Sequence, residues 1–286
     1  MGVKSAIICG MITLLIALAV GLGGFLVSHF ACGVGTGWSV FNGVVGFLAT
    51  QGGVSYYFIK RIKADMNAVQ GIMAAAQKAV EAKTRQWMIR PPGSIQEAQK
   101  IIQNDMATAA RSALAETAKL MKYKPWVLMV EKQVATAQFH LNWMLKDFQA
   151  VDALMPKALF LDPASVAMKM ARMQMKGAGL DEIEKVYSKA VARVRYNGNV
   201  LPAATWSWIL VRRSEAENDQ GKRDALVDRA FKALGEALKK SDDATLKRNH
   251  EALMNNRVPQ FNNSGLGDQW YALHLEEPKI RTQRRR

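Results

Sequence analysis

Histidine and cysteine are the side chains of this protein best suited to metal binding or nucleophilic catalysis. They are few and well separated along the sequence, at His29, His140, His250, His274, Cys9 and Cys32. The sequence contains no His-Glu-x-x-His, Cys-x-x-Cys, Gly-x-Ser-x-Gly or Walker-type phosphate-loop motif. We therefore expect a protein that is not an enzyme, has no metal or cofactor, and uses each histidine as a packed or surface residue.

Paired carboxylates could serve acid–base chemistry. The pairs Asp181–Glu182 and Asp242–Asp243 both stand where a helix is predicted to begin, and the helix dipole favours acidic side chains there without a catalytic role. The Gly-Leu-Gly-Asp stretch after Ser264 follows no predicted strand, so it does not fit a nucleotide-binding turn. Four tryptophans either line a peptide groove or belong to a helical core: Trp126, Trp143, Trp206 and Trp208.

The elements that would position any such residues begin with an uncharged block, since residues 5–59 contain no Asp, Glu, Lys or Arg. Two apolar stretches within it, 5–27 and 38–59, each allow a helix of about 33–35 Å, enough to cross a hydrocarbon core of about 30 Å. The Gly-Val-Gly-Thr-Gly sequence between them suits a turn. We predict a transmembrane helical hairpin over residues 1–59.

A cleaved export signal is the alternative interpretation of this block. The apolar region of such a signal normally runs about 7–15 residues, which is shorter than either stretch here. A lipoprotein signal would need small residues before its cysteine, whereas His29, Phe30 and Ala31 precede Cys32. We therefore expect the hairpin to remain uncleaved.

Flanking charges predict the orientation of the hairpin. The chain has 39 Lys and Arg against 24 Asp and Glu, a net charge of +15, and none of the basic residues lies in the turn. Basic residues precede the first stretch and directly follow the second, so the positive-inside rule places both termini in the cytoplasm. The predicted membrane-interface residues are Trp38, Tyr56, Tyr57, Lys60, Arg61 and Lys63. Anionic lipid headgroups are candidate partners for such charge.

The second apolar stretch carries amide and glycine residues at Asn42, Gly43, Gly46 and Gln51. Polar side chains in lipid need partners, and small residues let helices approach closely. These residues either pack within the hairpin and support a homo-oligomer, or they contact a partner membrane subunit or line a channel. Two helices can enclose a pore only by oligomerising.

Apolar residues continue beyond the block with heptad-like spacing. They alternate at steps of four and three, with Lys83 as the polar exception, at Ile62, Met66, Val69, Met73, Ala76, Val80, Lys83 and Trp87. We expect one unbroken helix over 38–89, ended by the Pro-Pro-Gly sequence 91–93. Ser94 and Glu97 form a capping-box pattern that begins a second helix. Residues 60–122 are thus predicted to form a coiled-coil-like helical hairpin, which serves as a stalk or a docking surface.

Between residues 123 and 258, apolar and small residues recur at matching offsets in successive short helices. They are Phe148, Val151, Met155, Ala158, Pro163, Ile183, Tyr187, Ala190, Ala230, Leu234 and Ala237. This pattern resembles the second helices of tetratricopeptide (TPR) units, whose period is about 34 residues. The resemblance implies a TPR-like α-solenoid with a capping helix. The first helices lack the Trp-Leu-Gly-Tyr signature, so an unrelated α-helical bundle is the alternative, and Pro156 is expected to kink its helix.

Residues 259–286 combine a docking segment with a basic tail. Trp270, Leu273 and Leu275 lie in an amphipathic stretch and are expected to dock back on the repeats. Five cations without an acid end the chain, at Lys279, Arg281, Arg284, Arg285 and Arg286. This tail is either solvated or bound to anionic lipid. Nucleic acid is the weaker alternative, because no aromatic residues are interleaved for base stacking.

Together these features predict an all-α, membrane-anchored scaffold that binds protein partners through a cytoplasmic helical-repeat domain. In arrangement the chain is similar to bacterial inner-membrane proteins that join two amino-terminal helices to TPR units and help to assemble other complexes. That similarity implies an integral protein of the bacterial inner membrane. The alternatives are a structural subunit of a larger membrane complex, such as a secretion or envelope-assembly machine, and an enzyme whose site leaves no motif.

Overall fold

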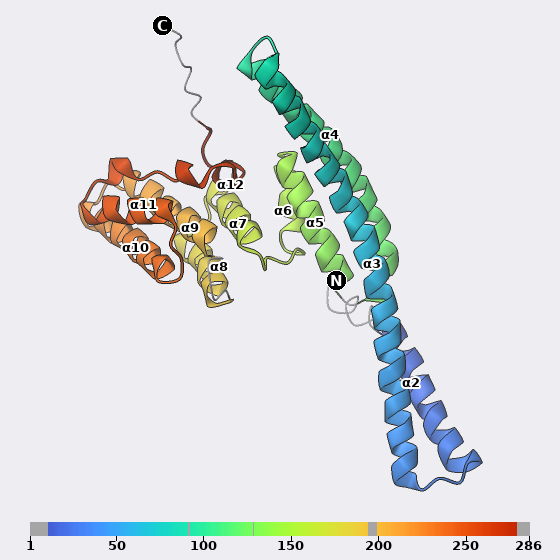
Figure 1. The fold of residues 1–286 in the computed structure, drawn as a ribbon. Helices are drawn as coiled ribbons and strands as arrows, with labels where there is room; N and C mark the ends of the chain where they lie inside the picture. Colours follow the sequence, from blue (N-terminus) through green and yellow to red (C-terminus); the bar gives the residue numbers. More distant parts are fainter. Residues whose placement is uncertain (1–10, 91, 128, 194–198, 279–286) are drawn as a thin grey trace. The chain divides into compact units, whose positions relative to one another are not determined.

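The computed structural model describes residues 11–90, 92–127, 129–193 and 199–278. Every regular element in these residues is a helix (Figure 1), which confirms the prediction of an all-α protein. Contacts divide the chain into two compact units, Met1–Leu159 and Phe160–Arg286. The division lies inside the segment 123–258, for which the sequence predicts one array of repeats.

The first unit begins with an antiparallel helical hairpin. Helix α2 (Met11–Leu26) continues into a π-helical turn, η1 (Val27–Ala31), and α3 (Thr36–Ile89) returns beside α2 (Figure 1). Gly33 makes the reversal with a φ of 63°, a backbone conformation that side chains other than glycine rarely adopt. The turn falls where the sequence predicts it.

Helix α3 has 54 residues and a length of about 81 Å, without the break that would separate two helices. Its second half pairs with α4 (Ile95–Lys119), and the predicted heptad face is buried or half-buried at every position. Lys83, the polar exception on that face, reaches Asp105 of α4 at 2.5 Å. The Ser94 hydroxyl accepts a hydrogen bond from the Glu97 backbone N–H at 3.1 Å, which confirms the capping pattern.

A 3₁₀ turn, η2 (Leu120–Tyr123), leads to the last two helices of the first unit, α5 (Val130–Met144) and α6 (Phe148–Leu154). The expectation that Pro156 kinks its helix is wrong, because α6 ends before this proline. Proline has no N–H to donate to the carbonyl four residues earlier, so the helix stops instead of bending.

The second unit consists of five helices followed by three short turns. The helices are α7 (Pro163–Met175), α8 (Leu180–Arg193), α9 (Val200–Glu215), α10 (Gln220–Leu238) and α11 (Ala244–Met254), and the turns are η3 (Val258–Gln260), η4 (Ser264–Leu266) and α12 (Asp268–Tyr271). Helix α7 packs on α8, and α9 packs on α10. Helix α9 also contacts α7 and α8, so the two pairs share one hydrophobic core.

Acidic residues at the starts of these helices have structural roles. The Asp162, Asp219 and Asp243 carboxylates each accept a backbone hydrogen bond in the first turn of the following helix. Asp181 and Glu182 occupy the first turn of α8, where the dipole favours them. Helix capping and the dipole thus explain why acidic residues gather at these positions.

Candidate functional site

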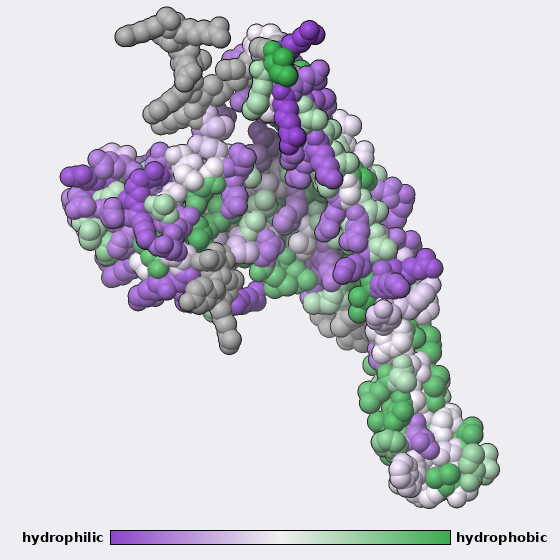
Figure 2. All heavy atoms as spheres, viewed as in Figure 1, coloured by the Kyte–Doolittle hydropathy of each residue, from purple (hydrophilic) through white to green (hydrophobic). Residues whose placement is uncertain are grey.

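The α2–α3 hairpin, taken as residues 11–59, has a largely apolar surface (Figure 2). Within the described residues, one helical segment, Ile12–Ala31, is long and apolar enough to cross a membrane, with a mean hydropathy of 2.1. The hairpin also contributes most of the large apolar side chains that the described residues expose, including Leu15, Leu18, Leu22, Val27, Phe30, Val40, Phe41, Val44 and Leu48. Contiguous apolar patches of this kind are rare on soluble monomers, so this surface suits lipid or protein better than water.

Aromatic residues flank the apolar part of α3. Trp38 lies near its start, and Tyr56 and Tyr57 lie near its end, about 27 Å further along the helix axis. All of the predicted interface residues are exposed: Trp38, Tyr56, Tyr57, Lys60, Arg61 and Lys63. The Arg61 guanidinium lies 5.5 Å from the centroid of the Tyr57 ring. The aromatic spacing is close to the hydrocarbon thickness of about 30 Å.

Polar side chains near the turn form hydrogen bonds within the hairpin. The Asn42 amide donates to the Ser28 hydroxyl at 3.0 Å, which links α3 to the turn after α2. The buried Ser39 hydroxyl donates to the Val34 carbonyl at 3.1 Å. These bonds lower the cost of placing polar groups in an apolar region.

Glycines allow α2 and α3 to approach closely. A Cβ atom built on Gly21 or on Gly43 would lie 2.9 Å from the carbonyl oxygen of the other residue, so a larger side chain at either position would force the helices apart. A Cβ atom on Gly46 would lie 3.8 Å from the Val20 carbonyl oxygen. Asn42, Gly43 and Gly46 therefore all take part in contacts inside the hairpin.

Gln51 differs from the other predicted packing residues. Its side-chain oxygen is buried and has no hydrogen-bond partner in the part of the chain that the structure describes. The adjacent Gly52 and Gly53 have open space where a Cβ atom would stand. These residues leave one place on α3 where a polar partner would be favourable.

The residues behind the TPR resemblance are packing positions. Val151, Ile183, Tyr187, Ala190, Ala230, Leu234 and Ala237 are buried, and Phe148, Met155, Ala158 and Pro163 are half-buried. The Tyr187 ring stacks on Trp206, with centroids 5.9 Å apart. Burial, together with the charge of Glu236, raises the pKa of Tyr187 to about 12. These side chains stabilise the helical cores and leave little surface for a ligand.

A groove of about 830 Å³ opens on the second unit between α9, α10 and α11. Its lining combines the apolar side chains Val227, Phe231, Leu253, Met254 and Val258 with the charged residues Glu215, Arg223, Asp224 and Asp228. The Arg223 Nε atom is buried and finds no acceptor among the described residues. An apolar floor beside several carboxylates suits a polypeptide segment that carries apolar and basic side chains. This groove was not predicted from the sequence. Its α10 residues lie on one helical face, but that face mixes charged and apolar side chains, and the rest of the lining comes from distant segments.

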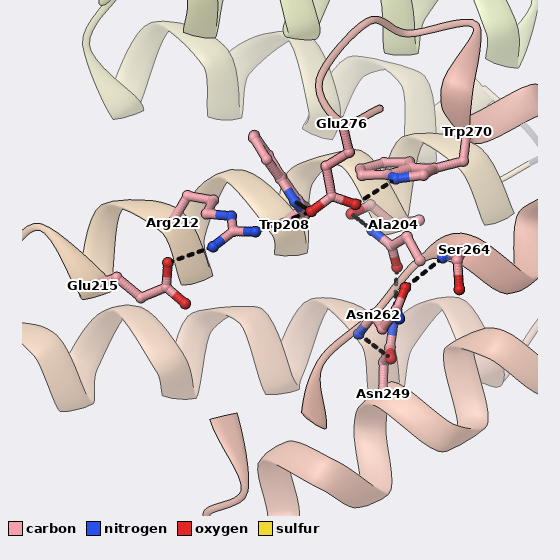
Figure 3. Close-up of polar contacts among 10 residues, drawn as sticks. Ala204, Trp208, Arg212, Glu215, Asn249, Asn262, Ser264, Trp270 and Glu276 are labelled. Carbon is pink, nitrogen blue, oxygen red and sulfur yellow. Dashed lines mark hydrogen bonds and ion pairs between the residues drawn. The ribbon is translucent and has the colours of Figure 1, made fainter. Parts of the chain in front are cut away.

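In the carboxy-terminal segment, for which docking is predicted, Trp270 and Leu273 are fully buried. The Glu276 carboxylate accepts hydrogen bonds from the indole N–H groups of Trp208 and Trp270, at 2.8 and 2.9 Å, and from Arg212 at 3.0 Å (Figure 3). Burial raises the pKa of Glu276, but these bonds and the Arg212 charge outweigh it and hold the pKa below its usual value. The segment is therefore held by a charged carboxylate.

Asparagines fix the loop that precedes this docking segment (Figure 3). The Asn249 amide donates to the Asn263 side-chain oxygen at 2.7 Å, and the Asn263 amide donates to the Ala204 carbonyl at 3.1 Å. The Asn262 backbone N–H donates to the Asn249 side-chain oxygen at 3.0 Å. This buried network joins α9, α11 and the loop, and its bonded polar groups have a structural role.

The remaining predicted residues lie apart from one another. His250 stacks on Phe231 with ring centroids 4.2 Å apart, and His29 Nδ1 lies 3.3 Å from the Val34 carbonyl oxygen. Trp143 and Trp206 are buried, as a helical core requires. In the described residues, no group of three or more His, Cys, Asp or Glu side chains could hold a metal ion. The basic tail lies outside the described residues: Lys279, Arg281, Arg284, Arg285 and Arg286.

Comparisons with protein-family models, with curated proteins and with solved structures find no match for this chain. The function must therefore be inferred from the apolar surface of the hairpin and from the groove with its charged lining residues.

Proposed function

We propose that this protein is a membrane-anchored scaffold that binds other proteins through its helical units. The observation that carries the proposal is the exposed apolar surface of the α2–α3 hairpin. Each square ångström of apolar surface left in water costs about 25 cal/mol, so a hairpin of this composition gains most by entering a bilayer. The second, glycine-rich stretch on α3 pairs with α2 through Gly43 and still exposes Val40, Val44 and Leu48.

The proposed orientation, in a bacterial inner membrane, places the turn outside and both termini in the cytoplasm. Lys60, Arg61 and Lys63 are exposed directly after the apolar part of α3, where the positive-inside rule requires cations on the cytoplasmic side. The turn that follows α2 has no Lys or Arg.

TPR-like stacking is proposed for the second unit. Two successive helix pairs, α7 with α8 and α9 with α10, are followed by α11, and α9 contacts both members of the preceding pair. The residues of the TPR resemblance at Ile183, Tyr187, Ala230 and Leu234 lie in the shared core. Repeat arrays commonly bind extended segments of other proteins through many small contacts.

The groove between α9, α10 and α11 is the proposed binding surface of this scaffold. Its floor offers Val227, Phe231 and Met254 to apolar side chains, and Asp224 and Asp228 stand nearby to attract cations. A partner segment with alternating apolar and basic residues would contact both the apolar floor and the carboxylates. Interfaces of this type derive specificity from charge and much of their affinity from buried apolar anchors.

Labelling of Cys32 tests the anchor. Cys32 is exposed at the hairpin turn, and a Cys9→Ser variant makes it the one cysteine of the chain. We expect a membrane-impermeant maleimide to label Cys32 in intact cells, and a protease added to those cells to spare a tag at the carboxyl end. Labelling that requires cell lysis, or a mature chain that begins at Cys32, would contradict the proposal.

Site-specific photocrosslinking tests the groove. A photoreactive residue at Met254, which lines the groove, is expected to give discrete adducts with a partner protein. Asp224→Lys combined with Asp228→Lys should abolish these adducts by repelling a basic segment. A photoreactive residue at the exposed Ser188 on α8 is the control. Adducts of equal yield at both positions, or adducts unaffected by the charge reversals, would refute the groove as the binding surface.

A structural subunit of a larger membrane complex is the second candidate function. It is favoured by the buried, unbonded oxygen of Gln51 beside the open Gly52 and Gly53, where another membrane helix could pack and donate a hydrogen bond. The native mass of the full chain in mild detergent distinguishes the two functions. A lone monomer or homo-oligomer supports the scaffold, and obligatory co-purification with other membrane subunits supports the second candidate.

A further inference from the structure

Helix α4 runs back along α3 and leads into residues 119–127, here called the return segment. The return segment packs against α3 just beyond the apolar part of α3. The Trp126 ring stacks on Phe58 with centroids 4.7 Å apart, and the Tyr123 ring lies 6.3 Å from Phe58. Leu120 and Tyr123 are buried in the core of the first unit. The return segment is therefore held at a defined height along α3, beside residues 58–65.

Polar contacts hold the return segment at the same position along α3. The Tyr123 hydroxyl donates to the Asp65 carboxylate at 3.0 Å, and the Lys122 ammonium lies 2.9 Å from the same oxygen. The hydrogen bond from Lys122 lowers the pKa of Asp65 and raises the pKa of Lys122, so both groups are charged at neutral pH. One carboxylate on α3 thus binds two neighbouring side chains of the return segment.

If α3 crosses the membrane as proposed, the position of the return segment along α3 also determines its depth in the membrane. From Trp38 to Tyr57 the helix advances about 28 Å, which is close to the thickness of the hydrocarbon core. The next residues, Phe58 to Asp65, advance about 10 Å more and so pass through the headgroup region. Because the return segment packs beside these residues, it lies in the headgroup region as well.

Cations predominate at this level of the first unit. They come from both parts of the chain, at Lys60, Arg61, Lys63, Lys119, Lys122 and Lys124. Three acids pair with cations of the return segment, Glu116 with Lys119, Asp65 with Lys122 and Glu131 with Lys124. The three basic residues on α3 leave an excess of positive charge, and tryptophan and tyrosine are the residues that favour a membrane interface.

From this juxtaposition we infer that the return segment is a second membrane-contact site, where Lys122 and Lys124 bind anionic phospholipid headgroups and Trp126 lies in the interface. The inference rests on the proposed membrane anchor and adds a partner to it. The lipid surface then holds the base of the α3–α4 coiled coil at two places, α3 itself and the return segment.

Hydrogen exchange of the full chain in lipid nanodiscs tests the inference. We compare discs of phosphatidylcholine alone with discs that also contain phosphatidylglycerol. Amides of the return segment should exchange at least about fivefold more slowly in the anionic discs, because each lysine near a charged surface contributes an effect of about this size. Lys124→Gln should remove most of this difference, and Lys122→Gln combined with Lys124→Gln should remove all of it.

Control variants separate lipid binding from folding. Lys239→Gln combined with Lys240→Gln changes exposed lysines of the second unit and should leave the difference intact. Lys122→Arg keeps the charge opposite Asp65 and should retain the protection that Lys122→Gln loses. Lys124→Gln leaves the Asp65 contacts in place but removes the ion pair with Glu131. Glu131→Gln removes the same ion pair while keeping the lysine, and it should leave the difference between the discs intact.

The outcomes also separate this inference from the proposed function. A chain that fails to enter either disc refutes the anchor. A chain that enters both discs with equal exchange in the return segment overturns the inference and leaves the anchor standing. Equal slowing by soluble heparin in neutral discs would indicate a general polyanion site, including nucleic acid, and would overturn the commitment to lipid.

Discussion

The α2–α3 hairpin and the second unit are both built from helices, but they sort their side chains in opposite ways. In the hairpin Leu48 is exposed while Ser28 and Ser39 are buried. In the second unit Leu234 and Trp270 are buried, and the face seen in Figure 2 is mostly hydrophilic. Helix formation alone therefore does not determine which face is buried. The proposed membrane anchor accounts for this difference, because lipid favours exposed apolar side chains and requires polar groups to find partners inside the hairpin.

The largest expected effect comes from the core of the second unit. Leu234→Ala removes a fully buried side chain and should cost about 2–5 kcal/mol in the free energy of unfolding, through lost burial and a residual cavity. Leu48→Ala, at a position 61% exposed in the hairpin, should cost less than about 0.5 kcal/mol in detergent. Denaturant unfolding of the full chain measures both, and equal costs would remove the contrast between the regions.

A charged residue on the hairpin surface should have the next largest effect. Leu48→Asp places a carboxylate midway along the proposed span and should disfavour membrane insertion by about 2.5–3.5 kcal/mol. Met254→Asp is the matched control, because Met254 is also 61% exposed but lies in the second unit. A translocon insertion assay on the full chain gives the apparent free energies. If Leu48→Asp behaved like the control, the hairpin surface would not face lipid.

Glu276 should show an intermediate effect that depends on pH. Glu276→Gln removes the charged acceptor shared by Trp208, Trp270 and Arg212, and should cost about 1–3 kcal/mol. Because the folded pKa lies below its ordinary value of 4.5, the carboxylate's contribution is complete at neutral pH and is lost as the pH falls through the folded value.

Acid titration of stability measures this contribution. The loss of stability on the acid side should be smaller in Glu276→Gln than in the unmodified chain. Glu277→Gln, at the exposed neighbouring position, is the control and should keep the full acid dependence. The same profile for both variants would show that Glu276 does not hold the docking segment.

The smallest expected effect is a difference in coupling energy between two amide hydrogen bonds. A double-mutant cycle on Asn42 and Ser28, inside the hairpin, should give a coupling of about 0.6 kcal/mol, as is typical of hydrogen bonds between membrane helices. The same cycle on Asn249 and Asn263, both fully buried in the second unit, should give about 1–1.5 kcal/mol. A larger coupling in the hairpin would reverse the comparison.

Local periodicity made much of the fold predictable. The unbroken course of α3, the Ser94 cap of α4 and the positions of the helices in the second unit all follow from patterns within one or two turns of the chain. Hydropathy also identified the hairpin, because runs of apolar residues without charge are rare elsewhere in the sequence.

Contacts between distant segments were not predictable in the same way. The stacking of Trp126 on Phe58 depends on the lengths of α3 and α4, and the groove depends on how three helices diverge. The buried asparagine network involves Asn249, Asn262 and Asn263, which in sequence look like ordinary surface and loop residues. Pro156 showed the limit of a local rule, because ending the helix and bending it are both compatible with proline.

The continuity of α3 has a mechanical consequence. No loop separates the part of this helix proposed to lie in the bilayer from the part paired with α4. A tilt of the first part therefore tilts the second part as well. On the proposed anchor, the helix from Asp65 to Ile89 extends about 36 Å beyond the headgroup region. A tilt of about 20°, common for membrane helices, would displace its far end sideways by about 12 Å. If α3 crosses the bilayer as proposed, a change in bilayer thickness that alters its tilt would displace Met88 and Ile89 more than the residues nearer the membrane.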